Sequence, residues 1–269
     1  MYLDFFGLKE FPFNITPDPR YLYFSPKHLE AMDLLLYGIQ ERKGFIELTG
    51  EVGCGKTTIC RAVLSRLTRS VQTSLVLNPC LDGSQLMRAI LTDFGIPPKG
   101  DDRLDLIEQL NNFLLDQAER DNNVVIIIDE AQDLQPDVME QIRLLSNLET
   151  DQHKLMQIVL AGQPELRERL AQHEFRQLRQ RILIRCHLSP LAREEIGDYV
   201  AHRLHVAGAN GDVAFDPDAL DGVHRYSAGI PRLINAVCDL AMLAGYVGQS
   251  KRISGREVEK ALDQLECSV

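Results

Sequence analysis

The sequence predicts an α/β fold: a three-layer αβα core around a five-stranded parallel sheet, followed by a smaller α-helical domain. Segments of strand length alternate with segments of helical periodicity up to Pro190, which is typical of a parallel sheet covered on both faces. Residues 124–128 are too continuously β-branched to be half-exposed, so they indicate a central strand. Beyond Pro190 the strand signals fade and helical patterns remain.

The composition is that of an ordinary globular protein. The 269 residues suit one large or two modest domains. A hydrophobic fraction of 45% and a charged fraction of 25% disfavour disordered and fibrous classes. The formal net charge of −10 argues against a surface broadly dedicated to nucleic acid or anionic lipid, although a local basic patch stays open. Scattered cysteines, the lack of a secretory signal and the lack of a long apolar run predict a soluble chain in a reducing cytoplasm.

Residues 1–27 are rich in aromatic residues and prolines, which favours an extended segment laid over a surface rather than a regular helix. A helix is expected to follow, with Ser25 as its N-cap and Pro26 at its first position. Residues 23–28, at the end of this segment, are candidates for base contact in a ligand site that the following segments define. Packing of these aromatic side chains on the core explains the pattern equally well.

Residues 50–57 fit the pattern G-x-x-x-x-G-K-[ST] at every fixed position, between an apolar strand and a segment of helical spacing. The glycines let backbone N–H groups turn toward the α- and β-phosphates of a nucleotide, and the helix start adds positive field. Lys56 would reach the β- and γ-phosphates, and the Thr57 hydroxyl would ligate Mg²⁺. The expected nucleotide contacts here are Gly50, Glu51, Val52, Gly53, Cys54, Gly55, Lys56, Thr57 and Thr58.

A strand is expected at residues 74–78 and helices near residues 84–94 and 104–120, before the central strand ends in two acids. Because open parallel sheets bind ligands at the carboxyl ends of their strands, Asp129 and Glu130 are candidates for catalytic chemistry. Asp129 would hold the Mg²⁺ shell with Thr57, and Glu130 would orient and polarise the attacking water. The acid pair alone is a weak signal, but in this order after the glycine loop it becomes a strong one.

A helix over residues 136–148 and a strand over 155–161 lead to Gln163, which therefore also falls at the carboxyl edge of the sheet. Its side chain can place the lytic water, or it can serve as a cap or turn residue before Pro164. Residues 165–178 read as one helix before a fifth strand at 182–188, and five arginines fall within this region: Arg167, Arg169, Arg176, Arg179 and Arg181. They form a solvated helix face, or one of them projects into the nucleotide of a neighbouring subunit.

The C-terminal part is expected to form a helical lid with helices near residues 194–207, 217–226, 231–246 and 256–265. Asp216 before Pro217 predicts an N-cap, and Ser254 with Glu257 predicts a capping box. Arg232 falls in the first turn of a lid helix, where a cation is poorly placed for the helix dipole, so we suspect another purpose.

Longer signatures carry a family resemblance. They are Met-Tyr-Leu followed by Phe-Phe-Gly-Leu at the N-terminus, Ile-Asp-Glu-Ala-Gln at 128–132, Gln-Ile-Arg-Leu-Leu-Ser-Asn-Leu-Glu-Thr at 141–150 and Gly-Ile-Pro-Arg-Leu-Ile-Asn at 229–235. With them the chain resembles, over essentially its whole length, the AAA+ ATPases of the general secretion pathway protein A family. That family includes relatives that serve pilus biogenesis and exopolysaccharide or exosortase systems.

The resemblance implies a role for each matching position. Lys56 and Thr57 would form Walker A, Asp129 and Glu130 Walker B, Gln163 the sensor 1 equivalent and Arg232 sensor 2. Arg181 would be the arginine finger, with Arg179 as the alternative, since the short motif contains both. Sensor 1 is more commonly Asn in AAA+ proteins. The implied domains are a strap and leading helix (1–40), a P-loop ATPase core (41–190) and a helical lid (191–269).

The family therefore implies a cytoplasmic ATP-hydrolysing protein that uses Mg²⁺ and forms a ring-like homo-oligomer. Its partners would be protein components of a bacterial envelope machine, such as a type II secretion, pilus or exopolysaccharide system. Full-length secretion members continue into a membrane span and a periplasmic region, so this chain is a cytoplasmic fragment or a stand-alone relative. It would be the cytoplasmic part, or a peripheral partner, of an inner-membrane assembly, and would reach the membrane only through a region absent from this chain. A DNA-associated AAA+ ATPase of the transposition or initiator type is the alternative, supported by residues 167–185 and opposed by the net acidity. A nucleotide-gated scaffold with negligible turnover is another.

Overall fold

The computed structural model describes residues 2–78, 80–100, 102–149 and 154–266. Met1 and Thr150 of the family signatures, and residues 267–269 of the expected lid, lie outside these ranges. The chain forms two compact units that alternate along the sequence. The helical unit comprises Met1–His28, Glu51–Thr58 and Ser189–Val269, and the sheet unit comprises Leu29–Gly50 and Ile59–Leu188. Within the described ranges, no helix is both long and apolar enough to cross a bilayer.

The sheet unit contains the predicted five-stranded sheet, and its strands pair in parallel in the order β2-β3-β4-β1-β5. The three central strands are buried along their whole length, whereas the edge strand β5 alternates between buried and exposed residues. This burial explains the continuous β-branched run of residues 124–128. The strands are β1 (Phe45–Gly50), β2 (Val71–Val76), β3 (Asn123–Ile128), β4 (Gln157–Gly162) and β5 (Ile182–Leu188).

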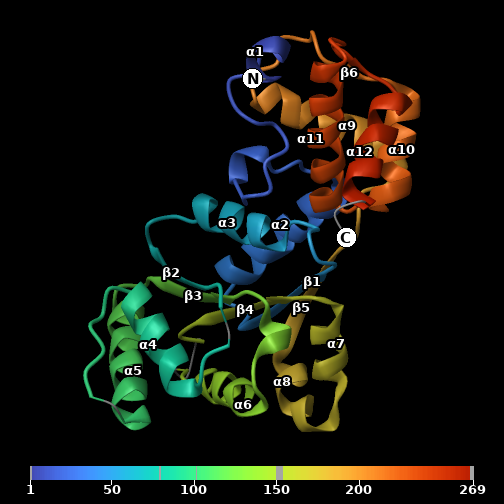
Figure 1. Ribbon diagram of the computed structural model, residues 1–269. Coiled ribbons are helices and arrows are strands. Elements are labelled where there is room, and N and C mark those ends of the chain that lie inside the picture. The colour runs from blue at the N-terminus through green and yellow to red at the C-terminus, as the bar shows by residue number, and fades with distance from the viewer. Residues whose placement is uncertain (1, 79, 101, 150–153, 267–269) are drawn as a thin grey trace. The chain divides into compact units, whose positions relative to one another are not determined.

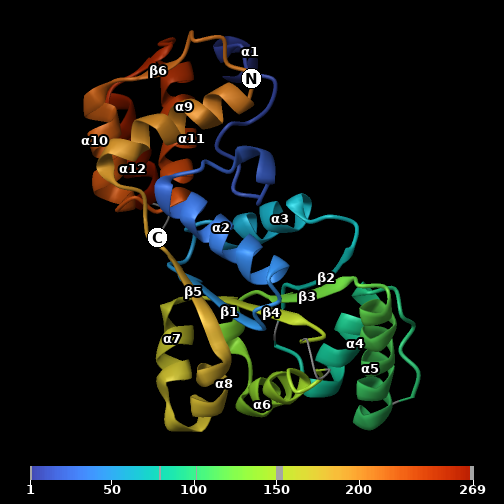
Figure 2. The same cartoon turned by 180° about the vertical axis from the view of Figure 1, so that it is seen from behind.

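Helices cover both faces of this sheet, as predicted, and complete the three layers (Figures 1 and 2). One face carries α2 (Pro26–Gln40), whose Gly38 lies against Ile46 and Ile184, and α3 (Lys56–Arg66). The larger core lies on the other face, where strand residues such as Ile126 and Leu160 pack with the remaining helices. These are α4 (Gly83–Asp93), α5 (Arg103–Glu119), α6 (Pro136–Leu145), α7 (Pro164–Ala171) and α8 (Arg176–Arg181).

The single helix expected over residues 165–178 is wrong. The helix α7 ends at Ala171, because Gln172 adopts an extended conformation with φ −64° and ψ 152°. A short 3₁₀ turn, η3 (His173–Phe175), follows and buries Phe175, and α8 begins at the next residue. The break therefore lies directly before an aromatic side chain that is buried in the core of the sheet unit.

The helical unit contains the four expected lid helices: α9 (Arg193–Val206), α10 (Pro217–Ser227), α11 (Pro231–Val247) and α12 (Gly255–Glu266). It also contains a small parallel pair of strands, β6 (Ala214–Phe215) and β7 (Arg252–Ile253). Strands of two residues are too short to give a periodic signal in the sequence. Asp216 occupies the N-cap position of α10, but its carboxylate pairs with Arg252 at 2.6 Å instead of capping the helix. The capping-box partner is present at α12, where Glu257 accepts from the Ser254 backbone N–H at 3.0 Å.

The expectation of an extended N-terminal segment is wrong in two places. A short helix, α1 (Tyr2–Phe6), and a 3₁₀ turn, η1 (Pro19–Tyr21), interrupt it, and both bury aromatic rings in the core of the helical unit. The segment between them is bound to α9, because the buried Arg203 donates to the Asn14 carbonyl at 3.0 Å and lies over the Tyr21 ring.

Candidate active site

The phosphate loop joins β1 to α3, and its conformation depends on its glycines. Gly53 and Gly55 have φ values of +84° and +95°, which side chains disfavour. Lys56, the first residue of α3, is only 5% exposed, and its ammonium donates to the Glu51 carbonyl at 3.2 Å. Backbone N–H groups at a helix start and a buried lysine are the elements that bind phosphate. The loop therefore fits a nucleotide phosphate group.

The lid helix α11 contacts this loop within the helical unit. The backbone N–H of Arg232 donates to the Gly53 carbonyl at 3.3 Å. A side chain at Gly53 would not fit, because its Cβ would lie 2.6 Å from the Cβ of Arg232 and 3.2 Å from Cγ2 of Ile230. The predicted sensor 2 residue and the phosphate loop are thus neighbours, and the Arg232 side chain itself is exposed.

A second neighbour of the loop, His28, was not predicted in this role. The imidazole is 3% exposed, with Nε2 3.1 Å from the Cys54 carbonyl oxygen and Nδ1 2.7 Å from the Ser25 hydroxyl. Burial lowers the pKa of His28, opposed by the hydrogen bond to Cys54. The Cys54 thiol is also buried, which raises its pKa to about 11.

The acid pair lies in the sheet unit at the end of β3. Asp129 is 2% exposed, and its carboxylate accepts from the Glu130 backbone N–H at 2.9 Å. Glu130 adopts a left-handed conformation, with φ 51° and ψ 37°. For a residue with a side chain this conformation costs about 1 kcal/mol or more, and such strain concentrates at functional sites. The backbone therefore turns Glu130 away from the path of the strand.

Two glutamines hold the Glu130 carboxylate. Its Oε2 accepts from Nε2 of Gln132 at 2.9 Å and from Nε2 of Gln163 at 3.3 Å. The backbone N–H of Gln163 in turn donates to Oε1 of Gln132 at 3.0 Å. Gln163 stands at the N-cap position of α7, yet its side chain makes no capping bond. The only sequence signal for Gln132 is its place in Ile-Asp-Glu-Ala-Gln.

One of the clustered arginines fixes the segment that carries Gln132. The guanidinium of Arg169, on α7, donates to the carbonyl of Gln132 and to that of Leu134, the latter at 2.7 Å. These two bonds bind the 3₁₀ turn η2 (Ala131–Asp133) to α7. The Arg169 guanidinium therefore bonds within its own chain. It neither belongs to a solvated helix face nor projects into a neighbouring subunit.

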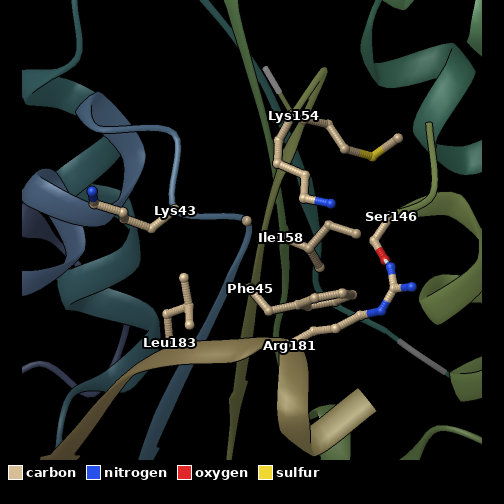
Figure 3. Close-up of a pocket in the computed structure, with 9 residues that line it drawn as sticks. Lys43, Phe45, Ser146, Lys154, Ile158, Arg181 and Leu183 are labelled. Atoms are coloured by element: carbon tan, nitrogen blue, oxygen red, sulfur yellow. Dashed lines mark hydrogen bonds between the residues drawn. The ribbon is translucent and has the colours of Figure 1, made fainter. Parts of the chain in front are cut away.

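The two candidate finger residues differ in their surroundings. Arg181 donates to the Ser146 hydroxyl at 2.7 Å and lines an apolar pocket of ≈170 Å³, with Phe45 and Ile158 among its other walls (Figure 3). Phe45 begins β1, so the pocket lies at the amino edge of the sheet, opposite the edge that carries the acids. Arg179 is exposed, and its carbonyl accepts from Arg185 at 3.1 Å. The fold thus does not bring Arg181 to Glu130 of its own chain.

Known proteins are similar to this chain in sequence and in fold. The AAA domain family matches residues 39–170. General secretion pathway protein A of Aeromonas hydrophila is 46% identical over 97% of this chain, which spans 48% of that protein, about half its length. The ORC2 protein of Aeropyrum pernix, solved as ADPNP-ADP complexes, matches this fold with a TM-score of 0.69 at 18% identity. The match covers 94% of this chain and 71% of the ORC2 chain.

The RuvB Holliday junction branch migration motor of Thermotoga maritima has a TM-score of 0.62 at 20% identity, with 90% of this chain and 70% of its own covered. Identities this low show the shared fold alone. The sequence relationship to the Aeromonas hydrophila protein is closer and extends along 97% of this chain. The chain belongs to the AAA+ proteins, and within them to those of the general secretion pathway protein A kind.

Proposed function

We propose that the chain binds Mg·ATP and hydrolyses it, acts as an oligomer, and couples this cycle to assembly of a bacterial envelope machine. The observation that carries the proposal is the state of Glu130: a strained backbone directs it at the carboxyl edge of the sheet, and two glutamine amides hold its carboxylate. A carboxylate held in this way keeps one orientation, as polarising an attacking water requires.

Each remaining residue has a part in this proposal. Lys56 would bind the β- and γ-phosphates, and Arg232 would contact the nucleotide from the lid. Thr57 and Asp129 would hold Mg²⁺, and their hydroxyl and carboxylate oxygens suit this hard cation. When bound, the ion would neutralise charge that develops on the phosphates. Gln163 would keep Glu130 and the water aligned, together with Gln132.

The test is steady-state phosphate release together with nucleotide binding. Glu130→Gln keeps the shape of the side chain but removes its charge, so we expect normal ATP binding and turnover reduced about 10²- to 10⁴-fold. Lys56→Ala should abolish binding as well. Unchanged turnover in the Glu130 variant would remove its assigned role. A wild-type protein that binds ATP but releases no phosphate at any protein concentration would be the nucleotide-gated scaffold.

We propose Arg181 as the finger that acts on the nucleotide of a neighbouring subunit, because its own chain keeps it away from the acid pair. Arg181→Ala should leave nucleotide binding intact and lower hydrolysis about 10³-fold or more. Arg179→Ala is the matched control, two residues away on the same helix. Normal turnover in the first variant and loss in the second would assign the role to Arg179. Hydrolysis that rises more than proportionally with protein concentration would support action between subunits.

The envelope role rests on the relative's name and on similarity over half of that relative's length. We propose that the chain acts on the cytoplasmic side, peripheral to the inner membrane, with secretion, pilus or polysaccharide components as partners. Cross-linking and pull-down from native cells with the Glu130→Gln variant, which should hold ATP without turnover, would identify them. Recovery of DNA with the trapped protein, with no envelope component, would favour the DNA-associated alternative.

A further inference from the structure

We propose that His28 is a positioning residue that keeps the Cys54–Gly55 peptide of the phosphate loop turned so that the Gly55 N–H faces the phosphates. The proposal rests on the nucleotide binding proposed above and adds a residue outside the glycine motif to the machinery of that site. All of the groups involved lie in the helical unit.

The hydrogen bonds of His28 determine its tautomer. A carbonyl oxygen only accepts, so Nε2, at 3.1 Å from the Cys54 oxygen, carries the proton. In a neutral imidazole Nδ1 then accepts, and the Ser25 hydroxyl donates to it at 2.7 Å. The same hydroxyl oxygen accepts from the His28 backbone N–H at 3.4 Å, which is the N-cap bond of α2. The start of α2 and the loop are therefore joined through one buried ring.

The bond to Cys54 also fixes the next backbone N–H. In a trans peptide the C=O and the following N–H point in opposite directions, and no cis peptide occurs among the described residues. When His28 holds the Cys54 carbonyl on one side, the Gly55 N–H must face the other side. In a loop of this pattern the inward N–H groups are the ones that bind the phosphates.

Without this bond, little in the loop itself would hold the peptide. Gly55 has no side chain and accepts positive and negative φ almost equally, so rotation of the Cys54–Gly55 peptide meets little local resistance. The preceding carbonyl, of Gly53, already has a partner in the Arg232 N–H. His28 thus supplies the restraint that glycine cannot, and both of its ring nitrogens are engaged in doing so.

Binding of fluorescently labelled ADP, with inorganic pyrophosphate as competitor, tests the proposal. His28→Ala should weaken both ligands about tenfold or more, since a buried hydrogen bond is lost and a phosphate donor is freed to turn away. His28→Gln places an amide N–H near the position of Nε2 and should restore most of the affinity. His28→Asn, whose amide is one carbon shorter, should not. This pair also decides the question if the alanine variant does not fold.

Tyr199→Phe is the control for general loss of stability, because it removes the buried hydrogen bonds of the Tyr199 hydroxyl to Asn235 and from Arg203, in the same unit, and neither bond involves the loop. It should bind both ligands normally. Equal affinity in the wild type, His28→Ala and His28→Asn would overturn the proposal, as would weakened ADP with unchanged pyrophosphate, which would indicate a contact to the base. A wild type that binds neither ligand would instead refute the proposed nucleotide binding itself.

Discussion

Replacing each glycine of the phosphate loop by alanine should separate backbone strain from contact with the lid. Both Gly53 and Gly55 have positive φ, so either substitution should cost about 1–2 kcal/mol in strain. At Gly55 the new Cβ has room, since its nearest neighbour, Nε2 of His28, would be 3.6 Å away. At Gly53 it would lie 2.6 Å from the Cβ of Arg232, an atom that no rotamer change can move. Overpacking of this kind adds about 1–3 kcal/mol.

The measurement is urea denaturation of the nucleotide-free variants, so that loss of ligand binding does not enter the comparison. We expect Gly53→Ala to be less stable than Gly55→Ala by the overpacking contribution of about 1–3 kcal/mol. In the background of Arg232→Gly, which removes the opposing Cβ, most of this difference should disappear. Equal stabilities of the two alanine variants would refute the contact between loop and lid. A difference that persists without the Arg232 side chain would refute the role of Arg232 and assign the overpacking to Ile230.

Three further outcomes are expected. Iodoacetamide at pH 8 should modify the exposed Cys80 long before the buried Cys54, whose pKa is raised to about 11, and mass spectrometry of the native and unfolded protein would check this. Because burial lowers the pKa of His28 in the folded protein, His28 takes up a proton at higher pH in the unfolded chain than in the folded one. The stability that the neutral His28 contributes is therefore present above about pH 6.5 and is lost on acidification. Between pH 7.5 and 5.5 the free energy of unfolding should therefore fall less steeply in His28→Gln than in the wild type, by at most about 1.4 kcal/mol per pH unit. Gly229→Ala should abolish cooperative folding of the lid, measured by circular dichroism, because at φ +81° the new Cβ would overlap the backbone carbonyl of Leu191; a normal melting curve would contradict that.

The parts of the fold that depend on periodicity and on the parallel direction of the strands could be predicted from the sequence. A continuous β-branched run of strand length indicates a central strand, and parallel pairing then puts the residues after β3 and β4 at one edge. This is why Glu130 and Gln163, 33 residues apart in sequence, were expected at the same edge and are joined by a hydrogen bond in the structure. The glycine loop is local in sequence, so its place between a strand and a helix and its need for glycine at positive φ also follow from its residues.

Contacts that depend on side-chain packing could not be predicted. Nothing in the spacing of His28 indicates that it reaches Cys54, since the bond requires α2 and the loop to meet in three dimensions. Gln132 was hidden for a related reason: a 3₁₀ turn directs it back toward Glu130, and that turn depends on Arg169 in another helix. The break after α7 likewise contains no glycine or proline that would indicate it in the sequence, and it lies directly before the buried ring of Phe175.

The phosphate loop shows why a motif alone does not determine a binding site. Its two glycines make the required backbone conformation accessible, but accessibility also permits other conformations. Two successive carbonyls, of Gly53 and Cys54, are held by Arg232 from the lid and by His28 from the N-terminal segment. Each held carbonyl fixes the N–H that follows it. Groups far away in the sequence therefore set the direction of the phosphate donors, and a nucleotide that pulls on those donors acts on both segments.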